Sequence, residues 1–111
     1  MEKIITFEDF TKVDLRIGTI TAVNDFPNAH RPAYQLVIDF GDLGIKKSSA
    51  QITTQYKKEE LVNRQIVAVV NFPKKQIANF MSACLVVGAV KANDVFLLHP
   101  ETKVKNGSQV S

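Results

Sequence analysis

The chain has 111 residues, of which 45% are hydrophobic, and it carries 14 Lys and Arg against 11 Asp and Glu, for a formal net charge of +3. This length is typical of one domain, so we expect a single domain over residues 1–111. The longest apolar run, residues 83–90, is far shorter than the roughly 20 residues that a membrane-spanning helix needs, and the N-terminus lacks the pattern of a signal peptide. The sequence therefore predicts a cytoplasmic protein without membrane insertion.

The positive charge is concentrated in the middle of the chain. Residues 1–42 hold four basic and seven acidic side chains, whereas residues 43–79 hold seven basic and two acidic ones. Such an excess suits a surface that binds phosphate or acidic peptide, because Lys and Arg that neutralise phosphates release condensed counterions. It is equally typical of an ordinary solvated face. Both interpretations stay open on charge alone.

The first half of the chain predicts a short helix followed by three strands. Thr6 can cap a first turn that contains Glu8 and Asp9, so a short helix is expected near residues 6–10. Residues then alternate in period two over 15–22 and 34–40, which is typical of strands. A turn at residues 41–44 leads into a third, shorter strand over residues 45–49.

The second half continues this pattern. Residues 56–62 favour a short helical stretch, residues 65–71 a buried strand, and residues 84–87 a fifth strand. Apolar residues 95–98 and the hairpin-like residues 105–108 indicate a C-terminal strand extension. Five strands with one helical piece between the third and the fourth predict an all-β chain, an OB-fold five-stranded barrel with short helices.

The side-chain patterns that common enzymes use are missing from the sequence. It contains no glycine-rich phosphate loop, no Gly-x-Ser-x-Gly, no His-Glu-x-x-His and no Cys-x-x-Cys. Cys84 is the single cysteine and lies in an apolar run, which predicts a core residue. His30 and His99 are far apart, each without a second ligand at metal spacing. We therefore expect no catalytic residue, no metal and no cofactor, and a function in binding.

Four motifs resemble the tRNA-binding-domain family of OB-folds. They are DFTKVDLRIG at residues 9–18, KKSSAQI at 46–52, VVNFP at 69–73 and SACL at 82–85, and they occur in the family's order. Within the family the match is closest to free-standing secretion chaperones. The resemblance implies a non-catalytic homodimer that assists protein export by binding unfolded or pre-secretory polypeptides and cooperates with the SecA export motor. It also implies an alternative function, the structure-specific binding of tRNA.

Polar, basic and aromatic residues in or near these motifs are the candidate binding residues for peptide or tRNA. The guanidinium of Arg16 is expected on the outer surface, where it meets a ligand or pairs with Asp14 or Asp39. Two adjacent lysines on the third strand must face opposite sides, so only one of them can lie in a groove. The complete predicted set is Arg16, Lys46, Lys47, Ser48, Ser49, Gln51, Asn71, Phe72, Lys74, Lys75 and Ser82.

Three further expectations concern the aromatic residues, Asn71 and the flanks. Phe72 and Phe80 flank a lysine pair, and at least one of them is expected to pack in the core rather than stack on a ligand. Asn71 either contacts a ligand or closes a turn through its own backbone.

Residues 1–13 and 91–111 carry apolar side chains outside the barrel, which need a surface to cover them, so these flanks are expected to build an isologous dimer.

Overall fold

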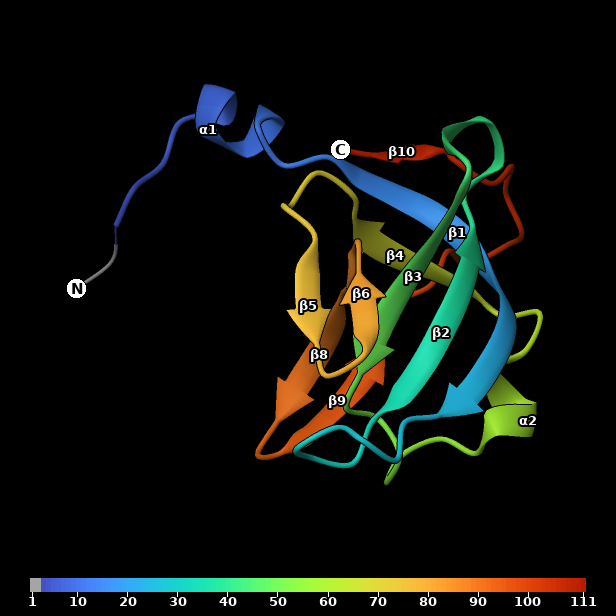
Figure 1. Ribbon diagram of the computed structural model, residues 1–111. Coiled ribbons are helices and arrows are strands. Elements are labelled where there is room, and N and C mark those ends of the chain that lie inside the picture. The colour runs from blue at the N-terminus through green and yellow to red at the C-terminus, as the bar shows by residue number, and fades with distance from the viewer. Residues whose placement is uncertain (1–2) are drawn as a thin grey trace.

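Six strands form one curved antiparallel sheet in the computed structural model, which describes residues 3–111 (Figure 1). The main path runs in the order β3-β2-β1-β4-β7, and β10 pairs with β1. These strands are β1 (Leu15–Asp25), β2 (Tyr34–Asp39), β3 (Ile45–Ala50), β4 (Gln65–Val69), β7 (Leu85–Val86) and β10 (Gln109–Val110). The Ala83 amide donates a hydrogen bond to the Lys47 carbonyl at 2.8 Å, so the far edges of the sheet meet and the barrel is nearly closed. The predicted OB-like barrel and its C-terminal strand extension are confirmed.

Two short antiparallel ribbons complete the β structure. One consists of β5 (Lys75–Ile77) and β6 (Phe80–Ser82), and the other of β8 (Gly88–Lys91) and β9 (Asp94–Leu97). The prediction of a single strand over 84–87 was wrong in extent, since β7 covers two residues and the chain then enters β8. The β5–β6 ribbon was not predicted at all. Its strands of three residues are too short to show the alternation of apolar and polar residues that indicates a strand.

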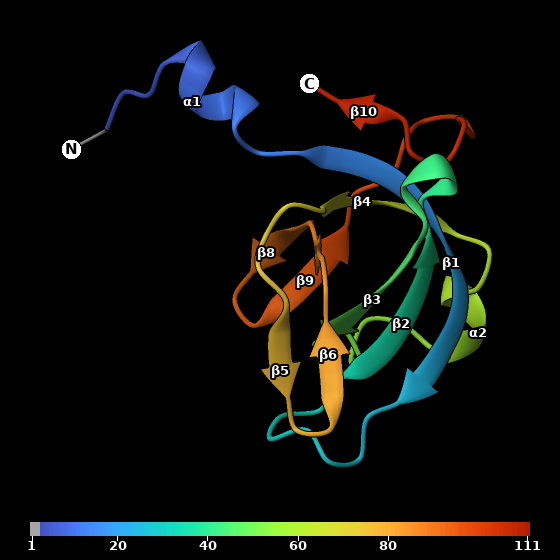
Figure 2. The ribbon, with the colours of Figure 1, turned by 45° about the horizontal axis from the view of Figure 1, so that its top comes forward.

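Within residues 3–111, one short helix precedes the first strand and two further short helical elements connect strands. In α1 (Phe7–Thr11) the Thr6 Oγ1 accepts from the Asp9 amide at 3.1 Å and the Asp9 carboxylate accepts from the Thr6 amide at 3.2 Å, a capping box that confirms the predicted helix start. The α2 helix (Lys58–Leu61) is shorter than expected, and η1 (Gly41–Leu43) replaces a predicted turn. The α1 helix buries none of its residues and stands away from the barrel (Figure 2).

The core lies inside the barrel and follows the period of the strands. In β2 buried and half-buried residues alternate, and in β4 all five residues are buried. Cys84 is buried in this core, as predicted. Gly18 faces the inside so closely that a Cβ there would lie 2.6 Å from the Ile38 side chain and 2.7 Å from the Phe40 ring. The full core cluster is Ile20, Tyr34, Leu36, Ile38, Phe40, Ala50, Ile52, Leu61, Ile66, Ala68, Cys84 and Leu97.

Helices of the described part of the chain are all short. Between residues 3 and 111, none has the length and apolar character needed to cross a bilayer.

Candidate binding groove

A hollow of about 730 Å³ lies between β3 and the chain that forms β5 and β6. Its apolar side chains include Phe72, which is 54% exposed, and Leu85, which is 50% exposed. Leu85 pairs with Val69 at the end of β4, close to where the chain turns into residues 72–74. The complete lining is Ser49, Gln51, Phe72, Pro73, Lys74, Lys75, Gln76, Ile77, Ser82, Cys84 and Leu85.

A second hollow of about 330 Å³ continues the first one toward the β1–β2 loop. The two share Ser49, Gln51 and residues 75–77, so they form one continuous groove. The second hollow adds Ala29, His30, Arg31 and Ala33, which come from that loop. We call the combined lining of the two hollows the β3–β5 groove. Its described lining contains basic and neutral side chains but no carboxylate.

Hydrogen bonds and one aromatic contact hold the β5–β6 ribbon in place. The Ser49 amide donates to the Ser82 Oγ at 3.2 Å, which fixes β6 beside β3. At the other end of the ribbon, Phe80 packs on Phe26 with ring centroids 5.3 Å apart. Phe80 is only 7% exposed, so the expected core role of one of the two phenylalanines is confirmed. The ribbon is therefore a fixed wall of the groove.

Cys84 belongs to both the core and the groove wall. Burial raises the pKa of its thiol to about 11, and the opposing effects of Lys46 and of a hydrogen bond from Ser48 are smaller. The thiol is therefore protonated at neutral pH, and the thiolate is the form that acts as a nucleophile or metal ligand. Cys84 contributes an apolar surface to the groove rather than reactivity.

The structure brings six of the eleven predicted binding residues into the lining. Ser49 on β3 and Gln51 just past its end share a face because alternate residues of an extended chain do so, and the remaining four lie in or next to the β5–β6 ribbon. These six are Ser49, Gln51, Phe72, Lys74, Lys75 and Ser82.

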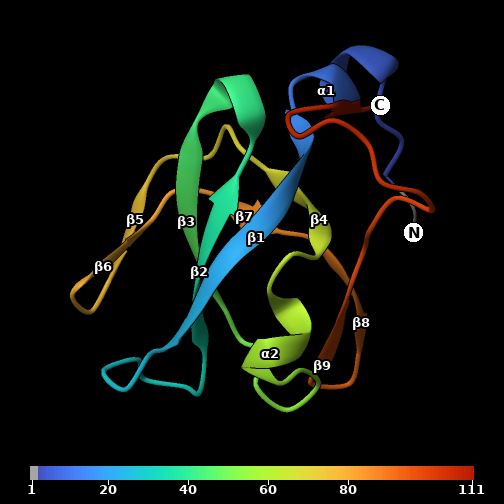
Figure 3. The same ribbon diagram turned by 90° about the vertical axis from the view of Figure 1, so that its right-hand side faces the viewer.

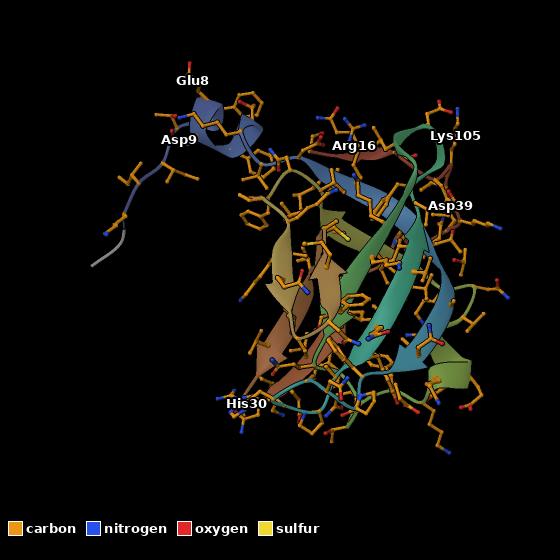
Figure 4. All side chains as sticks on the ribbon, in the orientation of Figure 1. Glu8, Asp9, Arg16, His30, Asp39 and Lys105 are labelled. Atoms are coloured by element: carbon orange, nitrogen blue, oxygen red, sulfur yellow. The ribbon has the colours of Figure 1, made fainter. Side chains whose placement is uncertain are left out.

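The other five predicted residues lie elsewhere. The Arg16 Nε donates to the Asp14 carboxylate at 2.7 Å, so the ion-pair alternative holds, and its guanidinium also donates to the Gly107 carbonyl at 3.1 Å. Figure 4 shows Arg16 at the opposite end of the barrel from His30. Ser48 is fully buried, and Lys46 and Lys47 lie on β3 outside the groove lining.

Asn71 has a structural role that neither sequence interpretation foresaw. Its side-chain carbonyl accepts from the Asp14 amide at 3.0 Å, and its amide donates to the Lys12 carbonyl at 2.7 Å. Asn71 therefore ties the root of the N-terminal arm, residues 3–13, to the end of β4 instead of closing a turn through its own backbone.

Nine lining residues were missing from the predicted set. His30 and Arg31 lie on the β1–β2 loop, which in OB-folds commonly contacts ligands, and this was the available signal for them. Ala29 and Ala33 lie on the same loop, and the other five border the β5–β6 ribbon or the start of β7. The missed residues are Ala29, His30, Arg31, Ala33, Pro73, Gln76, Ile77, Cys84 and Leu85.

Comparisons of structure find similar solved proteins, among them two chaperones. The structure of chaperone CsaA from Bacillus anthracis is 53% identical in sequence, with a TM-score of 0.93, and the match covers 98% of this chain and 100% of the other. The CsaA chaperone protein from Picrophilus torridus is 52% identical, with a TM-score of 0.91, over 97% of this chain and 100% of the other.

Comparisons of sequence give a family. The methionine–tRNA ligase of Pyrococcus abyssi is 38% identical over 109 residues, which are 98% of this chain but only 15% of the ligase. The chain thus spans about a seventh of the length of the curated relatives it matches. The family model described as "Putative tRNA binding domain" matches residues 15–109. The chain therefore belongs to the tRNA-binding-domain family, and it is similar along almost its whole length to chaperones named CsaA.

Proposed function

We propose that the chain is a non-catalytic chaperone of the CsaA type that binds extended segments of unfolded or pre-secretory polypeptide in the β3–β5 groove. The observation that carries this proposal is the mixed lining of the groove. Phe72 and Leu85 expose half of their surface to a ligand, which suits apolar side chains of a client. Ser49 and Gln51 stand beside them with a hydroxyl and an amide, which suit an extended peptide backbone.

The proposal includes a dimer, with residues 1–111 as one domain and with its contacts made by the apolar side chains of the flanks 1–13 and 91–111. Ile4 is 96% exposed, Ile5 64% and Phe7 78%, on an arm that projects from the barrel. Apolar side chains gathered on a projecting segment favour association, and a two-fold interface is the commonest form. Light scattering at micromolar concentration is expected to give twice the monomer mass, and a monomer would contradict this part.

The cellular setting is also part of the proposal. A chaperone that holds pre-secretory clients works before translocation, so we propose a cytoplasmic location and cooperation with the SecA motor. Co-purification of SecA with the chain from a cell extract tests this. If SecA does not co-purify after nuclease treatment and mild cross-linking, the proposed SecA contact is contradicted. The proposal that peptides bind in the groove is not affected by that result.

The groove is tested by replacing Phe72 with alanine. Phe72 is 54% exposed, so Phe72→Ala is expected to change stability by less than about 0.5 kcal/mol. Loss of a central aromatic contact costs about 1–2 kcal/mol of binding, or about five- to thirtyfold in Kd. The measurement is fluorescence anisotropy with a labelled presequence peptide, together with suppression of client aggregation.

The matched control is Val90→Ala, which truncates an apolar side chain that is 73% exposed outside the groove. Peptide affinity should stay unchanged in this variant. Equal losses in Phe72→Ala and Val90→Ala would show that clients bind exposed apolar surface in general. Absence of peptide binding by the unmodified protein at high micromolar concentration would contradict the chaperone function.

A second candidate function, tRNA binding, is favoured by the charge of the same groove. Lys74, Lys75 and Arg31 line it without a carboxylate among the lining residues, and the family model is that of a tRNA-binding domain. Phosphate binding predicts affinity that falls steeply with salt, because each neutralised phosphate releases counterions.

The variant Lys74→Gln/Lys75→Gln separates the two functions. It should lower the salt slope of tRNA binding by about one per lost phosphate contact and leave an apolar peptide almost unaffected. Lys47→Gln/Lys57→Gln removes the same charge from exposed residues outside the groove and is the control. A tRNA affinity that does not depend on salt, or that both double variants lower equally, would contradict binding in the groove.

A further inference from the structure

A third hollow, of about 370 Å³, lies apart from the β3–β5 groove. It is formed where the chain enters β4 and where it leaves β9, and none of its residues lines the groove. We propose that this hollow binds a phosphate group, and we call it the Arg64 pocket. Its lining is Asn63, Arg64, Gln65, His99, Pro100, Glu101, Thr102 and Lys103.

Both ends of the segment 99–103 are fixed to the barrel. Before it, the Leu98 carbonyl accepts from the Val67 amide and the Leu98 amide donates to the Val87 carbonyl, each at 3.3 Å. After it, the Gln65 side chain holds Val104 by two hydrogen bonds, accepting from its amide at 3.0 Å and donating to its carbonyl at 2.6 Å. Figure 3 shows this part of the chain rising past β4 toward β10. The pocket is therefore formed before any ligand arrives.

Arg64 is held in a definite orientation by an aromatic ring. Its guanidinium carbon lies 5.2 Å from the centroid of the Tyr56 ring. That ring is itself anchored, because the Tyr56 hydroxyl accepts from the Leu97 amide at 3.0 Å and the Tyr56 carbonyl accepts from the Tyr34 hydroxyl at 2.8 Å. A guanidinium stacked on a fixed ring keeps its in-plane N–H donors available for a planar, two-point contact with an oxyanion.

The charges around the pocket favour an anion. Among residues 3–111, no carboxylate lies within ion-pair distance of Arg64 or Lys103. Glu101 is the one acidic residue of the lining, against two basic side chains, Arg64 and Lys103. The Asn63 amide and the Thr102 hydroxyl add neutral donors from the two walls of the pocket.

A phosphate group fits the hydrogen-bond donors of this pocket better than a carboxylate group does. Donors stand on both walls, residues 63–65 on one and 99–103 on the other, and a phosphate offers at least two non-bridging oxygens around a tetrahedral centre. The volume leaves room for an attached sugar or base. The phosphate can belong to inorganic phosphate, to a nucleotide or to an RNA backbone, and these sources share the recognition chemistry.

The test is a titration followed by amide NMR at constant ionic strength, with inorganic phosphate, adenosine 5′-monophosphate and a short single-stranded RNA as separate ligands. Saturable shifts are expected at residues 63–65 and 99–103. Arg64→Gln should weaken phosphate binding by about tenfold or more, since a charge-assisted contact is lost. Lys103→Gln, at an exposed position, should weaken it in the same direction without threatening the fold.

The matched control is Lys47→Gln, which removes the same charge at an exposed position outside the groove and outside the Arg64 pocket and should leave phosphate binding unchanged. Tighter binding of RNA than of the mononucleotide would assign the pocket to an RNA backbone, and equal binding would assign it to a free nucleotide or phosphate.

Three results would overturn the proposal. They are the absence of saturable shifts up to about 10 mM phosphate, shifts spread over exposed lysines throughout the chain, and unchanged binding in both Arg64→Gln and Lys103→Gln.

Discussion

Replacing Gln65 by leucine removes the side chain that holds the C-terminal segment against β4. Gln65 is 8% exposed and uses all of its polar atoms. Its amide nitrogen donates to the Val104 carbonyl at 2.6 Å and to the Asn106 Oδ1 at 3.0 Å, and its carbonyl accepts from the Val104 amide at 3.0 Å. Leucine has a similar volume, so the change deletes hydrogen bonds and leaves no large cavity.

The size of the effect follows from these contacts. Three hydrogen bonds at about 0.5–1.5 kcal/mol each give about 1.5–4.5 kcal/mol. Val104 is 37% exposed, so water can reach its freed backbone groups, and Asn106 keeps its bond from the Thr19 hydroxyl at 2.7 Å. The added apolar surface of leucine offsets about 1 kcal/mol. We therefore expect the free energy of unfolding to fall by about 2 kcal/mol.

Urea unfolding followed by circular dichroism measures this change, and hydrogen exchange of the Val104 amide measures it locally. Gln35→Leu is the control, because Gln35 is half-buried on β2 and its side chain makes no hydrogen bond within residues 3–111. If the free energies of unfolding of the two variants differ by less than about 0.5 kcal/mol, the Gln65 side chain does not stabilise the fold through these hydrogen bonds. Unchanged exchange at Val104 would refute this role of Gln65 independently. Phosphate binding at the Arg64 pocket should weaken in Gln65→Leu as well, because one wall loses its support.

Three other substitutions give further tests. Gly18→Ala places a Cβ 2.6 Å from the Ile38 side chain and should lower the unfolding free energy by about 1–3 kcal/mol in urea, whereas an unchanged midpoint would mean that the barrel relaxes freely. Burial raises the Cys84 pKa from 9.0 to about 11, so the unfolded chain loses this proton first. The stabilisation that the protonated Cys84 thiol contributes to the fold is fully present below pH 9 and is lost as the pH rises from 9 to about 11. The free energy of unfolding of the unmodified protein, measured relative to that of Cys84→Ala, should fall by about 2–3 kcal/mol over that pH range. If this relative stability does not change with pH, the raised pKa is contradicted. Asn71→Ala removes two hydrogen bonds to the arm root and should cost about 1 kcal/mol and speed amide exchange in α1, with Asn93→Ala as the exposed control. Equal exchange in α1 for both asparagine variants would contradict the role of Asn71.

The barrel strands were predictable because their burial follows a simple period. In β2 every second residue from Tyr34 to Ile38 is buried, and the sequence shows that alternation directly. The prediction ended β1 at residue 22, but the strand continues to Asp25. A register shift between Ile20 and Ala22 changes which residues face the core there, and the period of two is lost.

The groove was only half predictable, for a reason that lies in β5 and β6. Ser49 on β3 and Gln51 just after it could be found because a recognisable motif carries them. The opposite wall is a ribbon of two three-residue strands whose connection has Ala78 at φ 52° instead of a glycine. An alanine in that conformation gives no turn signal in the sequence. Contacts with β3 and with Phe26 hold the ribbon, and such contacts appear only in three dimensions.

The Arg64 pocket was even harder to predict from the sequence than the groove. Its two walls are separated by more than thirty residues in the sequence and contain no motif. What joins them is Gln65, an ordinary polar residue in a strand whose other residues are all apolar. A polar residue at a buried strand position is the one signal that the sequence offered, since such a group must find hydrogen-bond partners.

Asn71 connects the two parts of the molecule on which the proposed function depends. The Val70 amide donates to the Asp14 carbonyl at 2.9 Å, and the Asn71 side chain adds its bonds to Lys12 and to the Asp14 amide. The next residue is Phe72, which lines the groove. The arm root and the apolar wall of the groove are thus fixed to each other through one short stretch of backbone. In the dimer that we propose, association through the arm would therefore set the relative orientation of the two grooves, and a long client could contact both only in that one arrangement.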